Sequence, residues 1–171
     1  MAPDLTLVPF DERHVRGFGE MLLDPDVLRF TRVPEPPPAD FAETWLERYR
    51  EGRRDGTREA FAIVDADGLF LGVAVVPEID AVARTVELGY VVHPAARRQG
   101  VATEALRRLT EWAFDELAPH RIQLIISPEN DPSKRAAERN GYRYEGTLRS
   151  VHVKQDIWED AEIWSRLPSD A

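Results

Sequence analysis

The stretch Glu87–Ala105, ELGYVVHPAARRQGVATEA, decides the fold, because an apolar run passes through a basic turn of small residues directly into a helical pattern. Residues 84–92 are rich in β-branched and aromatic side chains, which predicts a strand. The apolar residues that recur at helical spacing after the turn are Ala102, Ala105, Leu106, Leu109, Trp112, Ala113 and Leu117. A helix that opens on a small-residue turn leaves its first backbone N–H groups bare at the positive end of its dipole. The stretch therefore predicts a site for an anion such as a pyrophosphate.

Length, composition and charge limit the class of protein. With 171 residues, 43% of them hydrophobic, the chain can bury one continuous core, and we expect a single domain over 1–171 with its core at about 5–167. No window approaches about eighteen uninterrupted apolar residues, and the start lacks the pattern of a secretory signal, which favours a cytoplasmic protein without membrane contact. The formal charge of −9 disfavours direct nucleic-acid binding and makes a cationic acceptor easier to accommodate.

Cysteine and histidine usage excludes several chemistries. The chain has no cysteine, so disulfides, a cysteine-linked acyl-enzyme and cysteine-ligated zinc are impossible. The four histidines, His14, His93, His120 and His152, show no metal-ligand spacing. We therefore expect no metal.

The rest of the chain alternates strands and helices, which indicates a mixed α/β, α+β-like domain. Asp40 and Glu43 have the spacing of a capping box, and Asp131 with Pro132 predicts an N-cap followed by the first helical residue. Turns are expected at 66–68 and near 159–160, and prolines interrupt the chain at 24–25 and 34–38. The expected elements are strands over 5–10, 60–65, 69–76, 84–92, 121–126, 142–149 and 151–167, and helices over 14–23, 40–52, 101–118 and 131–140.

The basic turn reads R-x-x-G-x-A over 97–102 and lacks both GxGxxG and GxxxxGK[ST]. It resembles the acetyl-CoA pyrophosphate loop of the GNAT N-acetyltransferase superfamily. With ELGY at 87, HP at 93, N-x-x-S at 130 and NGY at 140, the chain is similar to the RimJ/RimL-like branch from about residue 5 to 167. The resemblance implies a mostly antiparallel mixed sheet of about seven strands, flanked by about four helices and splayed between the fourth and fifth strands. It also implies acetyl-CoA as co-substrate.

The small residues Gly100 and Ala102 let backbone N–H groups approach a pyrophosphate, and Arg97 and Arg98 supply positive charge. The resemblance adds backbone groups of the preceding strand that hold the pantetheine arm, one of them polarising the thioester carbonyl. Arg135 is expected at the 3′-phosphate or, equally, as a solvated helix residue. The full expected cofactor set is Tyr90, Val91, Val92, Arg97, Arg98, Gln99, Gly100, Val101, Ala102, Thr103, Asn130, Ser133 and Arg135.

Attack on a thioester needs a neutral amine, so a base must accept the ammonium proton. Glu87 is the predicted base, directly or through a water, although a glutamate on the solvated face of the strand has the same pattern. Ser133 is predicted to protonate the leaving thiolate or only to bind the co-substrate. Many family members carry a tyrosine where this chain has Ala137, which disfavours a tyrosine acid. His93 reads as a second base or, more often, as a turn residue.

The expected reaction is direct attack by a primary amine on acetyl-CoA in a ternary complex. The resemblance favours a protein N-terminus, as in ribosomal-protein-alanine N-acetyltransferases. Alternatives are a small amine, such as an aminoglycoside, a polyamine or an amino-acid-like metabolite, or a non-catalytic acyl-CoA-binding domain. An apolar edge on the last strands could form a homodimer. The expected walls of the acceptor pocket are Phe30, Trp45, Tyr144, His152 and Trp158.

Overall fold

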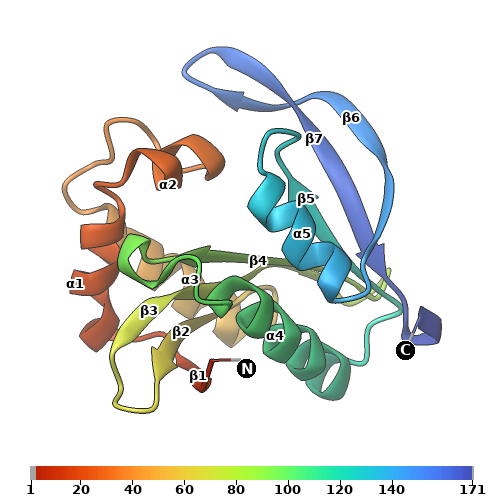
Figure 1. Ribbon diagram of the computed structural model, residues 1–171, viewed down its shortest axis with the longest axis horizontal. Helices are drawn as coiled ribbons and strands as arrows, with labels where there is room; N and C mark the ends of the chain where they lie inside the picture. Colours follow the sequence, from red (N-terminus) through yellow and green to blue (C-terminus); the bar gives the residue numbers. More distant parts are fainter. Residues whose placement is uncertain (1–2, 171) are drawn as a thin grey trace.

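The structure, a computed structural model that describes residues 3–170, contains one seven-stranded sheet in the order β1-β2-β3-β4-β5-β7-β6 (Figure 1). Neighbouring strands are antiparallel except β4 and β5, which are parallel. The predicted fold class is confirmed, with one helix more than expected. The strands are β1 (Leu5–Pro9), β2 (Glu59–Asp65), β3 (Phe70–Asp80), β4 (Thr85–Val92), β5 (Arg121–Ile126), β6 (Arg143–Lys154) and β7 (Ile157–Arg166). The helices are α1 (Glu12–Met21), α2 (Pro25–Phe30), α3 (Phe41–Asp55), α4 (Val101–Leu117) and α5 (Asp131–Arg139), with 3-10 turns at Pro94–Ala96 and Pro168–Asp170.

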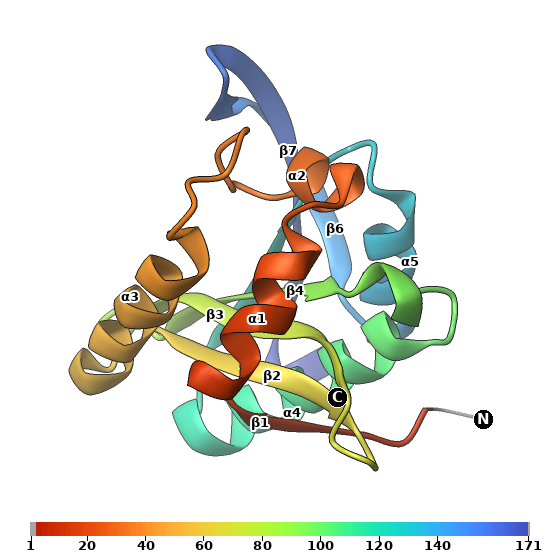
Figure 2. The same cartoon turned by 90° about the vertical axis from the view of Figure 1, so that its left-hand side faces the viewer.

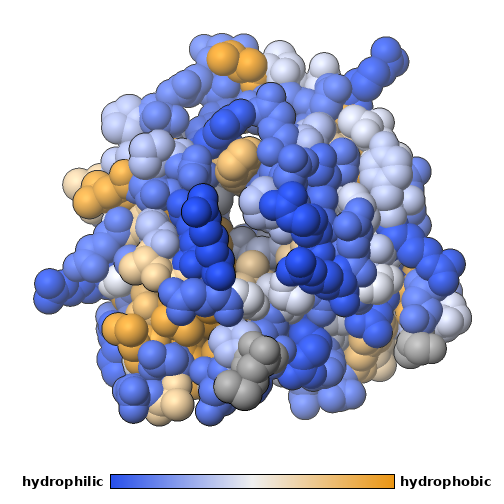
Figure 3. All heavy atoms as spheres, in the orientation of Figure 1, coloured by the Kyte–Doolittle hydropathy of each residue, from blue (hydrophilic) through white to orange (hydrophobic). Residues whose placement is uncertain are grey.

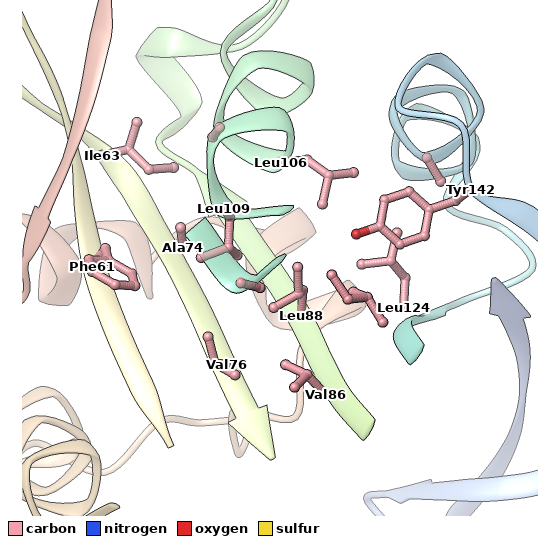
Figure 4. Packing of buried hydrophobic residues seen from close by; sticks show 14 of the residues in the cluster. Phe61, Ile63, Ala74, Val76, Val86, Leu88, Leu106, Leu109, Leu124 and Tyr142 are labelled. Carbon is pink, nitrogen blue, oxygen red and sulfur yellow. The ribbon is translucent and has the colours of Figure 1, made fainter. Parts of the chain in front are cut away.

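Helices cover both faces of the sheet, and each face has its own apolar cluster. On one face, α4 buries Leu106 and Leu109 against the sheet residues Leu88 and Leu124 (Figure 4). On the other face, α1, α2 and α3 pack around Phe10, Phe18 and Trp45, and Figure 2 looks onto the α1 side. Successive residues of β4 serve opposite faces, as the period of a strand requires. Glu87 therefore lies on the face that carries α3, whereas Tyr90 packs toward the α4 cluster.

Strands β4 and β5 separate soon after they pair. Their register covers only Thr85–Glu87 against Arg121–Gln123. Opposite β4, strand β3 carries one extra residue, because Val75 opposes Gly89 while Glu78 opposes Glu87. Such a bulge bends the strands locally. Within the described chain the β5 side of β4 beyond Glu87 is thus left without a strand partner, and this opens the sheet at its centre.

Two expectations in the N-terminal half were wrong in detail. The Asp24-Pro25 dipeptide does not simply interrupt the chain but begins α2, because the Asp24 carboxylate accepts the Val27 N–H at 3.0 Å and Pro25 fits the first helical position. The capping box at Asp40 is absent, since Asp40 has φ −99° and ψ 17° rather than the extended backbone of an N-cap.

Helix α3 also continues past Gly52 to Asp55 and ends at Gly56, which has φ +69°. Gly52 is required for packing and not for termination, because a Cβ there would lie 2.5 Å from the Arg58 Cβ. The sequence pattern could not separate these two uses of glycine.

Two further corrections concern the C-terminal half. The N-cap of α5 is Asn130 and not Asp131, because the Asn130 Oδ1 accepts the Ser133 N–H at 3.2 Å. The last hairpin turns at Gln155–Asp156, where φ is +51° and +60°, and not near 159–160. This pair lacks the glycine or asparagine that usually marks a left-handed turn, which is why the turn was misplaced.

Candidate active site

The first part of the site is the N-terminus of α4. Its N-cap is Gly100, which has φ +81° and no side chain with which to occupy the first N–H groups of the helix. A cavity of about 560 Å³ opens there. All the expected cofactor residues line it except Gln99, whose Nε2 donates to the Ala95 carbonyl at 3.1 Å on the outer side of the turn. The lining residues from the expected set are Tyr90, Val91, Val92, Arg97, Arg98, Gly100, Val101, Ala102, Thr103, Asn130, Ser133 and Arg135.

The two loop arginines have different surroundings. Arg97 forms ion pairs with Asp24 at 2.6 Å and with Asp26 at 3.4 Å, which ties the loop to the start of α2. Arg98 is exposed, has φ +62° and forms no ion pair with any residue in 3–170. Arg98 is therefore the free cation of the loop, while Arg97 is shared between the loop and α2. The sequence predicted that both arginines supply charge near the pyrophosphate, but it gave no indication that Arg97 has acidic partners.

Ser133 lies where the two halves of the cleft meet. The side-chain oxygen of Asn130 accepts the backbone N–H of Ser133, so this oxygen is used to cap α5. Beside Ser133 is the Tyr90 hydroxyl, which is buried and makes no well-formed hydrogen bond within residues 3–170. Burial raises the pKa of the Tyr90 hydroxyl. The sequence predicted a backbone role for Tyr90 but gave no signal that its hydroxyl would reach Ser133.

A second cavity, of about 510 Å³, contains Glu87. Burial raises the pKa of the Glu87 carboxyl; Arg32 opposes this shift and Glu78, its neighbour across the sheet, reinforces it. Glu87 is partly buried and not on an open surface, so the reading of a solvated strand glutamate does not hold. Burial also raises the pKa of Tyr49 to about 12, which keeps that hydroxyl protonated near neutral pH.

The two cavities are continuous. Their common lining comes from α2, the middle of β4 and the start of α5: Val27, Phe30, Thr31, Tyr90, Val91, Asn130 and Ser133. In Figure 3 a hollow rimmed by hydrophilic side chains is visible near the centre of the molecule. The splayed strands thus give one cleft with a helix N-terminus at one end and a carboxylate at the other.

The other expected pocket residues divide. Phe30, Trp45 and His152 line the cavity of Glu87, whereas Tyr144 and Trp158 lie outside it, 52% and 65% exposed. Burial lowers the pKa of His152, Arg32 lowers it further, and Glu159 has the opposite effect. His93 accepts the Ala95 N–H at 3.2 Å and lies outside both cavities, which agrees with the turn reading. Ala137 is fully buried. Sequence reasoning missed four arginines of this cavity: Arg29, Arg32, Arg48 and Arg58.

Comparison with known proteins agrees with this geometry. Residues 4–143 match the family model described as "Acetyltransferase (GNAT) domain". The chain is 31% identical over 127 residues to the Bacillus subtilis protein "Probable N-acetyltransferase YjcK", covering 73% of this chain and 70% of that one. It is 27% identical to the ribosomal-protein-serine acetyltransferase of Escherichia coli over 66% of this chain and 62% of the relative. Three curated B. subtilis relatives are matched over 51 to 70% of their own length.

Among solved structures, the spermidine N-acetyltransferase of Vibrio cholerae in complex with CoA and spermine superposes with a TM-score of 0.85. The match covers 98% of this chain and 97% of that one at 22% identity. The chain therefore belongs to the GNAT acetyltransferase family. This family consists of acetyl-CoA-dependent acyltransferases, in agreement with the predicted enzyme class and co-substrate.

No three side chains among the histidines and carboxylates of 3–170 come together as metal ligands. None of the helices in the same range is both long enough and apolar enough to cross a membrane.

Proposed function

We propose that the protein transfers an acetyl group from acetyl-CoA to a primary amine by direct attack in a ternary complex. One observation carries the proposal: the bare N-terminus of α4 and the buried carboxylate of Glu87 lie at opposite ends of one continuous cleft. The helix end suits the pyrophosphate, and the carboxylate suits the ammonium group that must lose a proton.

The steps divide among the chain's own residues. The carboxylate of Glu87 accepts a proton from the amine, directly or through a water, because its raised pKa makes it a better base than an exposed glutamate. Beyond Glu87, the backbone N–H groups of β4 that face β5 have no strand partner, and one of them can polarise the thioester carbonyl. The new C–N bond forms as the C–S bond breaks, and Ser133 either donates a proton to the departing thiolate and recovers one from solvent or only binds the co-substrate. No cysteine is available for an acyl-enzyme.

The acceptor we put first is a protein N-terminus, since one curated relative is named a ribosomal-protein-serine acetyltransferase. A small-molecule amine is the second candidate, because another similar protein is named a spermidine N-acetyltransferase. A non-catalytic acyl-CoA-binding domain would keep the α4 site without needing a buried carboxylate, and Glu87 argues against it.

Two measurements test the proposal. Acetyl-CoA added to the protein in a calorimeter is expected to bind at one site, and no binding would reject the proposal. Thiol release is then followed on a panel of N-terminal peptides, aminoglycosides, amino acids and polyamines, with mass spectrometry of the products. Binding without thiol release from any amine would favour the non-catalytic alternative.

Ser133→Ala separates the two roles predicted for this serine. If Ser133 is the proton donor, kcat of the variant should be roughly 10-fold lower, which is the loss expected for one hydrogen bond to the leaving group. The Kd for acetyl-CoA should not change. An unchanged kcat with a raised KM for acetyl-CoA would show that Ser133 only binds the co-substrate. Ser169→Ala, at an exposed serine that lies outside both cavities, is the matched control.

We also propose a homodimer formed through the last hairpin. The apolar side chains Leu148, Val151, Val153, Ile157 and Trp158 are exposed along β6 and β7, and exposed apolar side chains on a terminal hairpin suit an interface. Light scattering measures the mass in solution. The cytoplasmic location and the single-domain organisation remain sequence predictions within this proposal.

A further inference from the structure

The cavity of Glu87 has three arginines in its wall that have no acidic partner. Arg32 follows α2, Arg48 lies on α3 and Arg58 precedes β2. Within residues 3–170 none of the three has a carboxylate oxygen within ion-pair distance. Arg58 donates only to the Pro77 carbonyl, at 3.0 Å, and Arg48 lies over the ring of Tyr49.

Several other exposed arginines also form no ion pair within residues 3–170, Arg98 among them, so what distinguishes these three is that they share one cavity wall. Other arginines of the same elements are paired, as Arg29 is with Glu129, Arg50 with Glu12 and Arg53 with Glu59. The acidic excess of the whole chain therefore does not extend to this cavity wall.

The acidic residues of the cavity do not neutralise these arginines. Glu87 is partly buried, while Glu159 and Asp160 of β7 are exposed, as are the three arginines, and none of these carboxylates forms an ion pair with them. The Asp160 carboxylate accepts the Ser150 N–H at 2.9 Å. A guanidinium presents paired N–H donors that match the two oxygens of a carboxylate, so these groups are suited to an anion. A polyamine would meet the same groups as like charges.

Arg32 defines where such an anion would lie. Arg32 lines the same cavity as Glu87 of β4, His152 of β6 and Tyr49 of α3, so it lies on the wall that these three elements share. An acceptor whose amine is at Glu87 therefore has Arg32 within reach of a group only a few bonds away.

We propose that the acceptor is an amine that also carries a carboxylate, which Arg32 binds with support from Arg48 and Arg58. The inference rests on the proposed acetyl transfer and narrows its substrate class. The carboxylate belongs to a free amino acid or to an acidic residue close to a peptide N-terminus, and both have the same recognition chemistry.

Matched acceptors test the preference. The panel contains glutamate and its diamide, a tetrapeptide with Asp and Glu after its N-terminal serine and its Asn and Gln analogue, and spermidine. In at least one pair the carboxylate member should have a kcat/KM about 10-fold or more above its neutral analogue, with spermidine below both. The pair that shows the preference identifies the source of the carboxylate. Equal or better turnover of the neutral members or of spermidine would overturn the inference.

Variants locate the effect. Arg32→Gln should reduce the ratio of kcat/KM for the carboxylate acceptor to kcat/KM for its neutral analogue to about 1 to 2, mainly by raising the KM of the charged acceptor. Arg32→Lys should restore part of the preference. Arg54→Gln, on α3 but outside the cavity, should keep the wild-type ratio. A ratio that persists in Arg32→Gln, in Arg48→Gln and in Arg58→Gln would also overturn the inference.

The failure of the proposed function has a different signature. If the protein binds acetyl-CoA but none of the acceptors in the panel causes thiol release, acetyl transfer itself is rejected, and the inference with it. If the turnover is present but shows no charge preference, only the carboxylate subsite is rejected.

Discussion

Glu87→Gln is expected to lower kcat by about 10²-fold or more, while the Kd for acetyl-CoA stays at its wild-type value. Glutamine fills the same space in the cavity but cannot accept a proton. The co-substrate site at the start of α4 lies at the other end of the cleft, so its binding should not change. Single-turnover rates and calorimetry measure the two quantities separately.

The pH profile gives an independent check of the same role. Burial raises the pKa of Glu87 above its usual value, and a base works only when it is deprotonated. In the wild type, kcat should therefore rise with pH through this raised pKa, and that acid limb should be absent in Glu87→Gln. Arg32→Gln removes a nearby positive charge, so the limb should move to higher pH.

Glu78→Gln is the matched control for the carboxylate. Glu78 opposes Glu87 across β3 and β4, is exposed and lies outside the cavity. Its loss removes a like charge, so the pKa of Glu87 should fall slightly and kcat above the acid limb should stay near wild type. An unaltered pH profile in Glu87→Gln would reject Glu87 as the base.

Gly100→Asp is expected to raise the Kd for acetyl-CoA by roughly 100-fold or more, with little loss of thermal stability. Aspartate tolerates the left-handed backbone of this position better than most residues, so α4 should still form. Its carboxylate would occupy the N–H groups that the pyrophosphate needs and would repel that anion.

Gly100→Ala isolates the charge from the backbone strain. A Cβ at this position meets nothing closer than Pro3, at 3.4 Å, so alanine adds the strain without a clash or a charge. We expect less than roughly a 10-fold change in Kd for alanine. Similar Kd values for the two variants would show that the start of α4 is not the anion site. Thermal unfolding with and without acetyl-CoA provides the stability control.

Local patterns predicted the order of the elements and the phosphate turn, because these depend on residues close in the chain. The two-residue period of a strand likewise puts Glu87 and Tyr90 of β4 on opposite faces, which agrees with the structure. Asn130 lines the cavity at the start of α4, but its side-chain oxygen caps α5, a use that the expected ligand role did not include.

The remaining features depend on contacts between distant segments. Asp24 meets Arg97 across 73 positions, and no local pattern indicates that pairing. The unpaired state of Arg32 can be recognised only when all neighbouring carboxylates are placed. The Gln155–Asp156 turn was missed because the length of the strands, and not a turn motif, determines where the chain reverses.

The shared lining from α2 has a thermodynamic consequence. Val27, Phe30 and Thr31 contribute to the walls of both cavities, and Arg97 links the same helix to the phosphate loop. If one substrate shifts the equilibrium position of α2, the affinity for the other must change, and linkage requires the two effects to be equal. The ratio of acetyl-CoA affinities with and without acceptor therefore equals the ratio of acceptor affinities with and without acetyl-CoA. In that case a helix of six residues would couple the binding of the two substrates.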